Sequence, residues 1–165
     1  MKATFKRDIT KKKIYVIRDF KAPIELVWKA WTTPEILDQW WAPKPWKNIT
    51  KIMDFRVGGM WLYSMVGPQG EQHWSRTDYT AINPTQSFAG IDIFSDEHGT
   101  IIASLPTTNW HIAFESTPEG TRVNVINTFD REEDMLKLIE MGFEGGFNMG
   151  LQNLEDLLDA GSIKL

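Results

Sequence analysis

The stretch DREEDMLKLIEMGFEGGFNMGLQNLEDLLDAG, residues 130–161, decides the fold. Its apolar residues recur at the spacing of one helical face: Leu136, Ile139, Phe143, Phe147, Leu151, Leu154 and Leu158. Asp130 and Glu133 have the spacing of a capping box at its start, and Gly161 follows the predicted end near residue 159. The pattern therefore predicts one long C-terminal helix.

Glycines recur inside this predicted helix. Gly142, Gly146 and Gly150 lie four residues apart on one face, and Gly145 adds a fourth. Each glycine in a helix interior costs about 1 kcal/mol relative to alanine. Three explanations remain open: close packing of the helix on its neighbour, a kink near Gly145 and Gly146, or a bare face that leaves a cavity between helix and sheet.

The segments before this helix have the alternation of β-strands. Strands are expected at 13–20, 48–56, 60–66, 72–82, 86–94, 108–117 and 121–129. After the first strand, Pro23 and Pro34 each begin a short helix, and Thr33 caps the second. Consecutive strands with short connections form an antiparallel meander, whose apolar face only the C-terminal helix is long enough to cover. The sequence predicts a single α+β helix-grip domain over residues 1–165, with a curved antiparallel sheet wrapped around the last helix.

Composition excludes several classes of function. The 165 residues include no cysteine, so the chain has no disulfide, thiolate metal site or cysteine nucleophile. The formal net charge is −4, and the only basic run, Lys11-Lys12-Lys13, is expected to be a solvated approach to the first strand, so nucleic-acid binding is not expected. No apolar run approaches the ~20 residues of a membrane-spanning helix, and none follows the opening MKATFKRDITKKK as in a secretory signal peptide. We expect a soluble cytoplasmic protein without membrane contact.

Tryptophans concentrate in VWKAWTTPEILDQWW, residues 27–41. Trp28 and Trp31 have helical spacing and are expected in the core. The tryptophans around the proline-rich turn APKPW are expected at the rim of a cavity: Trp40, Trp41 and Trp46.

Three side chains are candidates for acid-base chemistry: His73, Asp92 and His111. If the strand alternates regularly, Asp92 shares a face with Phe88, Gly90 and Phe94, where burial would raise its pKa. No two histidines have a metal-ligand spacing, and no P-loop, GxGxxG or G-x-S-x-G motif is present. We expect neither metal nor cofactor, and the sequence does not favour an enzyme.

The walls of a ligand cavity can be proposed from the strands. On 60–66, the face with Trp61, Tyr63 and Met65 is the better candidate for the inner wall, while Arg76 and Asp78 could orient a polar ligand group or face solvent. The predicted cavity residues are Trp41, Trp46, Trp61, Tyr63, Met65, Arg76, Phe88, Asp92, Trp110, Phe143, Gly146, Phe147 and Gly150.

Four segments together resemble one protein family: FKAPIELVWKAWTTPEILDQWWAP (20–43), MDFRVGGMWLYSMVGPQGE (53–71), GTRVNVINTF (120–129) and MGFEGGFNMGLQNLEDLL (141–158). The chain resembles the bacterial proteins named after the activator of heat-shock protein 90 ATPase homologue, in the START-like (SRPBCC) superfamily. The resemblance covers nearly the whole chain and implies a helix-grip fold with a cavity between the sheet and the C-terminal helix. One departure is Gly142-Phe143, where family members often have Gly-Trp.

Three functions follow from these observations. The first is binding of a small, largely apolar molecule in an internal cavity, which rests on the glycine face, the aromatic strands and the resemblance. The second is contact with a chaperone or another regulatory partner. The third is a cyclase or hydrolase activity that uses the candidate acid-base residues. The expected assembly is a monomer or a weak homodimer.

Overall fold

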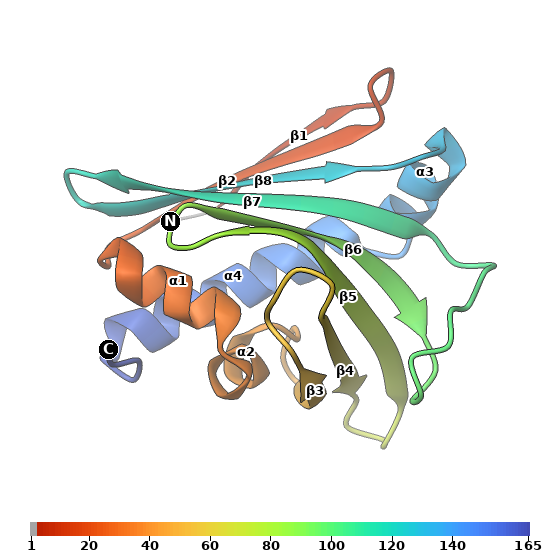
Figure 1. The fold of residues 1–165 in the computed structure, drawn as a ribbon, viewed down its shortest axis with the longest axis horizontal. Helices are drawn as coiled ribbons and strands as arrows, with labels where there is room; N and C mark the ends of the chain where they lie inside the picture. Colours follow the sequence, from red (N-terminus) through yellow and green to blue (C-terminus); the bar gives the residue numbers. More distant parts are fainter. Residues whose placement is uncertain (1–2) are drawn as a thin grey trace.

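In a computed structural model that describes residues 3–165, eight strands form one antiparallel sheet that four helices accompany (Figure 1). The strands are β1 (Thr4–Asp8), β2 (Lys13–Phe20), β3 (Lys47–Met53), β4 (Met60–Val66), β5 (Gln72–Asn83), β6 (Ser87–Ser95), β7 (Thr107–Thr117) and β8 (Gly120–Thr128). The helices are α1 (Ile24–Thr32), α2 (Pro34–Trp40), α3 (Glu132–Glu140) and α4 (Phe143–Asp159). The strand order is β1-β2-β8-β7-β6-β5-β4-β3, which confirms the predicted α+β helix-grip fold.

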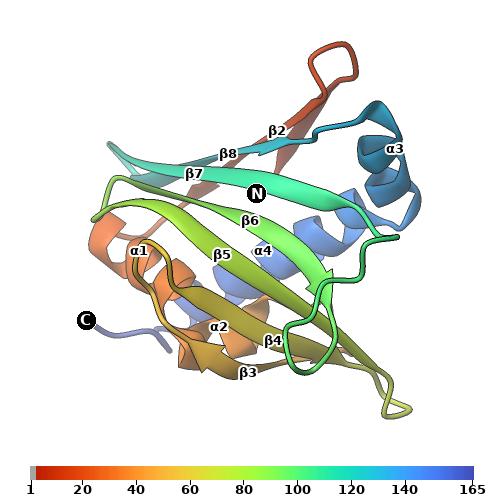
Figure 2. The ribbon, with the colours of Figure 1, turned by 45° about the vertical axis from the view of Figure 1, so that its right-hand side comes forward.

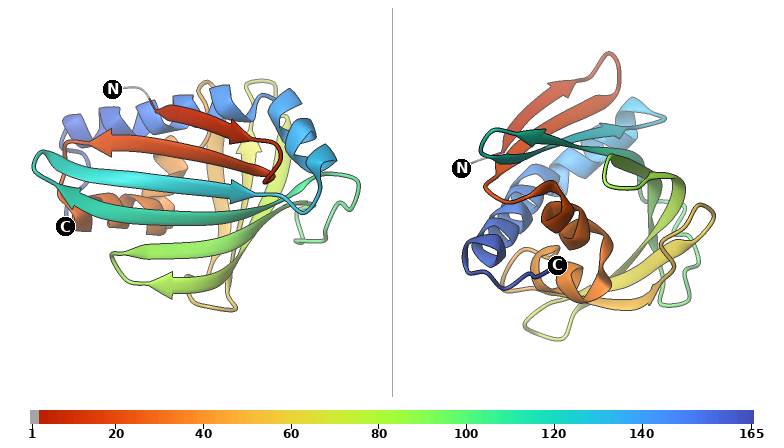
Figure 3. Two further views of the ribbon diagram at one scale, coloured as in Figure 1. Left: turned by 90° about the horizontal axis from the view of Figure 1, so that it is seen from above. Right: turned by 60° about the vertical axis from the view of Figure 1, so that its left-hand side comes forward.

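The sheet is strongly curved, and its concave face holds the core. Seen end-on, it curls around α4 and the α1–α2 pair (Figure 3), and α4 runs behind the middle strands in Figure 2. Register shifts between Thr50 and Ile52 and between Tyr79 and Ala81 interrupt the ladders, and such bulges bend a sheet. Within residues 3–165, no helix is both long enough and apolar enough to cross a membrane.

The structure contains one strand that the sequence did not predict. β1 pairs with β2, with Thr4 opposite Ile17, and forms one edge of the sheet. Its five residues, TFKRD, carry too little alternation to be recognised as a strand without this partner. The lysine run at 11–13 lies in the turn of this hairpin and at the start of β2, where Lys12 has a φ of 57°.

The long C-terminal helix was predicted as one element, but it is divided in two. Gly142 has a φ of +89°, in the left-handed region that glycine favours, so α3 ends before it and α4 begins after it. The predicted capping box is also absent, because Arg131 occupies the N-cap of α3 and pairs with Asp134 at 2.9 Å. The break therefore lies at Gly142, not at Gly145 and Gly146.

The glycine face of α4 is used for close packing. A Cβ atom at Gly150 would lie 3.2 Å from the carbonyl oxygens of both Trp40 and Trp41, and one at Gly146 would lie 3.8 Å from Pro43. Of the three explanations, the structure supports close approach of α4 to the chain after α2. The expectation of a bare face over a cavity is not met, because this face is occupied by residues 40–43.

Substitution of these glycines by alanine is expected to have opposite effects at two positions. Gly150→Ala should destabilise the protein by about 1–2 kcal/mol, because the added methyl group presses on two carbonyls and overpacking costs this much. Asn153 Nδ2 donates to one of them, Trp40 O, at 3.4 Å, and to Ala42 O at 3.1 Å, which restrains their movement. Gly145→Ala meets no atom within 4 Å and should stabilise by about 0.5 kcal/mol through helix propensity. Urea unfolding of both variants checks the pair, and a stabilising Gly150→Ala would refute the packing explanation.

The tryptophans of residues 27–41 differ from the prediction in which of them are buried in the core. Trp31 is buried as expected, but Trp40, expected at a cavity rim, is fully buried and donates from Nε1 to Ala30 O at 3.0 Å. The rings of Trp31 and Trp40 meet edge to face, with centroids 4.8 Å apart. Trp28 is only partly buried and packs edge to face on Phe114 of β7.

Candidate functional site

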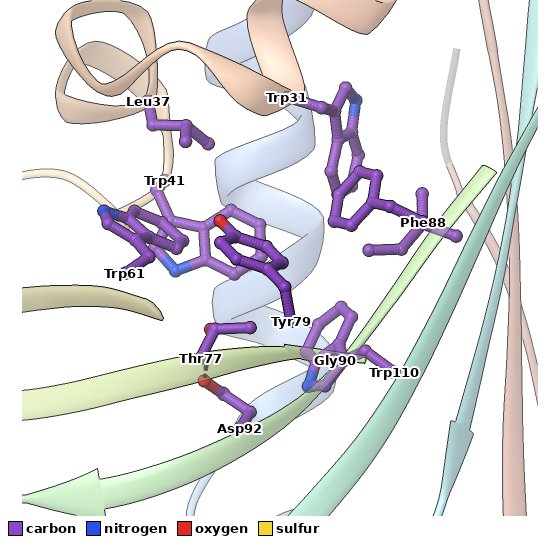
Figure 4. A pocket seen from close by; sticks show the side chains of 11 residues that line it. Trp31, Leu37, Trp41, Trp61, Thr77, Tyr79, Phe88, Gly90, Asp92 and Trp110 are labelled. Carbon is purple, nitrogen blue, oxygen red and sulfur yellow. Dashed lines mark hydrogen bonds between the residues drawn. The ribbon is translucent and has the colours of Figure 1, made fainter. Parts of the chain in front are cut away.

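A small cavity lies between the concave face of the sheet and the α1–α2 pair (Figure 4). We call it the aromatic pocket, and its lining is Trp31, Leu37, Trp41, Trp61, Thr77, Tyr79, Phe88, Gly90, Asp92, Trp110 and Ile112. Its volume is about 20 Å³, enough for about one water molecule, whereas small-molecule sites usually measure roughly 300–1,000 Å³. In this structure the pocket is closed down around its own side chains.

Strand alternation builds the floor of the pocket. On β6, Phe88, Gly90 and Asp92 face inward together, and Thr77 lies opposite Asp92 on β5. A Cβ atom at Gly90 would lie 2.8 Å from Thr77 Cγ2 and 2.9 Å from the carbonyl oxygen of Asp78. Only glycine fits this position, and it leaves the floor open between Phe88 and Asp92.

Trp41 fills the space that the sequence led us to expect as a cavity. Its ring centroid lies 5.6 Å from that of Trp61, 5.7 Å from Trp110 and 5.9 Å from Phe147 of α4. Its Nε1 donates to the Tyr63 hydroxyl at 3.1 Å, which holds the ring in place. The pocket therefore lies between the sheet and the α1–α2 side, and α4 contributes no residue to its lining.

Asp92 is the acidic group of the pocket. Thr77 Oγ1 donates to Asp92 Oδ1 at 3.0 Å (Figure 4). The residue keeps some solvent contact, but its carboxyl group is surrounded by protein. Burial, with a smaller contribution from the nearby Asp78, raises the pKa of Asp92 to about 7, although the hydrogen bond from Thr77 acts in the opposite direction. Near neutral pH the carboxyl group can therefore either donate or accept a hydrogen bond.

Two indole N–H groups of the pocket lack acceptors. Trp31 and Trp110 are buried, and the Nε1 atom of each has no hydrogen-bond partner among residues 3–165. Buried N–H groups are usually paired, because an unpaired one costs about 1–3 kcal/mol. In Figure 4 the nitrogen of Trp110 lies on the same side of the pocket as Asp92, so an acceptor atom placed there would remove the cost for Trp110.

Eleven of the thirteen predicted cavity residues fall into three groups, and the other two, Trp46 and Arg76, do not line the pocket. Five of them line the pocket: Trp41, Trp61, Phe88, Asp92 and Trp110. Others lie directly behind the lining: Tyr63 stacks on Trp61 with centroids 4.0 Å apart, and Phe143 and Phe147 pack on Trp110 at 5.9 and 5.3 Å. Met65 is partly buried against the core, and Gly146 and Gly150 face residues 40–43 as described above. The other six lining residues were not predicted as cavity residues: Trp31, Leu37, Thr77, Tyr79, Gly90 and Ile112.

Arg76 does not line the pocket. Its neighbour Thr77 points inward, so Arg76 and Asp78 project from the outer face of β5. There Arg76 Nη2 donates to Asp78 Oδ2 at 3.0 Å and Nη1 donates to the carbonyl oxygen of Gly99. The pair fastens the segment after β6 to the outside of the sheet.

Neither histidine candidate reaches the pocket. His111 is exposed on the outer face of β7, because its neighbours Trp110 and Ile112 point inward. His73 is exposed near the start of β5, and its ring lies 5.4 Å from that of Trp46. It borders a separate open groove of about 470 Å³, with Trp74 and Phe94. Among residues 3–165, no three His, Asp or Glu side chains are grouped so as to hold a metal ion.

One protein family matches most of the chain, including the whole of the aromatic pocket. The family described as "Activator of Hsp90 ATPase homolog 1-like protein" matches residues 21–159. The chain belongs to this family. All lining residues of the pocket fall within the range that matches the Activator of Hsp90 ATPase homolog 1-like family. No curated protein matches the chain.

Several solved structures share the fold of this family member. A protein from Arthrobacter aurescens is 30% identical, with 95% of this chain and 91% of that chain covered and a TM-score of 0.90. The protein Ms6760 from Mycobacterium smegmatis is 27% identical, with 94% and 96% covered and a TM-score of 0.88. The AHSA1 protein from Silicibacter pomeroyi, at 20% identity with 90% and 99% covered and a TM-score of 0.71, shows likeness of fold alone.

Proposed function

We propose that this protein binds a small, largely apolar molecule in the aromatic pocket. The observation that carries the proposal is the unpaired, buried Nε1–H of Trp110 in a wall made mostly of aromatic rings. A ligand with an apolar body and one acceptor atom would satisfy this donor and bury aromatic surface at the same time.

Binding requires the pocket to open, because about 20 Å³ holds no organic ligand. Trp41 is the side chain best placed to move. It is only partly buried, and it lies in the irregular segment between α2 and β3. Rotation of its ring breaks one side-chain hydrogen bond, to Tyr63, and no strand ladder. The backbone of residues 40–43 is held by α4, so the opening movement is confined to the Trp41 side chain.

The indole N–H resonances provide the test. Benzyl alcohol, added to ¹⁵N-labelled protein, should shift the indole signals of Trp41, Trp61 and Trp110, whose rings line the pocket. Trp74 lines the separate open groove beside His73, which we call the outer groove, so its signal serves as an internal control and should not move. A shift confined to Trp74 would place the site in the outer groove, and no shift at the solubility limit of the alcohol would refute small-molecule binding here.

A further inference from the structure

The Asp92 carboxyl group has no basic partner in the pocket. The titratable groups that act on it or respond to it are Asp78, Tyr63 and Tyr79, which are an acid and two phenols. The side chains that line the pocket from β7, α1 and α2, and Trp41 after α2, carry no charge. Arg76, the nearest base in sequence on β5, lies on the outer face and pairs with Asp78. Residues 3–165 thus leave this buried acid without a cation.

The surroundings of Asp92 are those that favour a cation. Trp41, Trp61, Trp110 and Tyr79 form the walls (Figure 4). The π-faces of indole and phenol rings attract ammonium groups, and the attraction is stronger when the cation is desolvated. A carboxylate beside such rings adds a direct charge partner, which gains strength in a pocket that excludes water.

We propose that the ligand of the aromatic pocket is a small organic ammonium ion with an apolar, preferably aromatic, body, and that its charge pairs with the Asp92 carboxylate. The inference rests on the proposed function and names the chemical class of its ligand. The Nε1–H of Trp110 stays available for an acceptor atom elsewhere in the same molecule. The alternative is a neutral ligand that accepts a hydrogen bond from protonated Asp92.

The two alternatives differ in their pH dependence. Without ligand the pKa of Asp92 is about 7, so below pH 7 a cation must displace a proton to form the ion pair. The affinity for a cation should therefore rise about tenfold per pH unit up to pH 7 and level off above it. Tyr63 and Tyr79 stay protonated across this range, because the pKa values of both phenols are raised. A neutral acceptor ligand should bind more weakly as pH rises through 7.

A charge series on one ring tests the inference: benzylamine, benzyl alcohol and benzoate, titrated at pH 8 with the indole signals of Trp41, Trp61 and Trp110 as the readout. We expect benzylamine to bind at least about tenfold more tightly than benzyl alcohol, and benzoate to bind more weakly than either. The affinity of benzyltrimethylammonium, whose charge is permanent, should follow the pH dependence given above.

Two variants test whether Asp92 is the residue that pairs with the ammonium group of the ligand. Asp92→Asn preserves the shape of the side chain, which can still accept a hydrogen bond from Thr77. The substitution should lower the affinity for benzylamine by at least about tenfold and change the affinity for benzyl alcohol by less than about threefold. Asp78→Asn is the matched control on the outer face, and its affinity for benzylamine should stay within about threefold of that of the parent protein.

The outcomes separate the two proposals. Equal binding of benzylamine and benzyl alcohol, or unchanged benzylamine affinity in Asp92→Asn, overturns the ammonium inference while the pocket remains a binding site. Absence of any shift with all three compounds overturns both.

Discussion

Replacement of Asp92 by asparagine is expected to make the protein more stable above pH 7, by up to about 4 kcal/mol. Asp92 ionises at an ordinary pKa of 3.8 in the unfolded chain, whereas burial raises its pKa to about 7 in the folded protein. The interval between these values corresponds to about 4 kcal/mol, an upper bound because the residue keeps some solvent contact. Asparagine has the same shape and carries no such cost.

The sign of the effect follows from proton binding. Below pH 3.8 both states hold the proton, so the group contributes no penalty. Between pH 4 and 7 the unfolded chain releases the proton and the folded protein keeps it, so the free energy of unfolding falls as pH rises. Above pH 7 both states are ionised and the loss is complete. Asp92→Asn should therefore match the parent protein near pH 4 and exceed it increasingly up to pH 7.

Urea unfolding of the parent and the variant at pH 4.5, 6 and 8 measures this difference. The Asp78→Asn variant provides the control, because Asp78 lies on the outer face in an ion pair with Arg76. The difference in the free energy of unfolding between Asp78→Asn and the parent protein should not increase with rising pH. A parent and an Asp92→Asn variant whose stabilities change in parallel with pH would show that Asp92 is not buried as a neutral acid.

Much of the fold could be predicted because periodicity reports it directly. Alternation placed seven of the eight strands to within a few residues, and it put Asp92 on one face with Phe88 and Gly90. Alternation does not say which face of a strand is inner. On β5 it left Arg76 and Asp78 as candidates, although Tyr79 on the opposite face was the better signal, because aromatic residues are more often buried than charged ones.

The size of the pocket could not be predicted from the pattern. Glycines four residues apart on a helix suit close packing or an empty space, and only the docking of α4 on residues 40–43 decides between them. Whether the rings of Trp41 and Phe147 fill the hollow also depends on how helices and sheet come together, which no local period encodes. The sequence identified the aromatic residues of the site but not the volume between them.

Replacement of Trp41 by alanine should open the aromatic pocket at a large cost in stability. The ring contacts Trp61, Trp110 and Phe147, and its Nε1–H is the donor to Tyr63. Large-to-small substitutions of buried tryptophans cost about 3–5 kcal/mol, through lost contacts and a cavity that collapses only in part, and we expect the lower end of this range because Trp41 is only partly buried. Trp46→Ala is the matched control: its ring lies on His73 outside the pocket, and the loss should stay below about 1 kcal/mol.

Indole should restore part of this stability, because it has the size and shape of the deleted ring and an apolar cavity readily accepts such a guest. At a concentration 100 times its dissociation constant it would return about 2.7 kcal/mol, and it should not raise the melting temperature of Trp46→Ala. Rescue of Trp41→Ala alone would show that Trp41 occupies the space a ligand needs and that the surrounding walls of the pocket persist without it. If indole leaves the melting temperature of Trp41→Ala unchanged, the walls close on the vacated space, and opening through Trp41 cannot be the route by which this protein takes up a ligand.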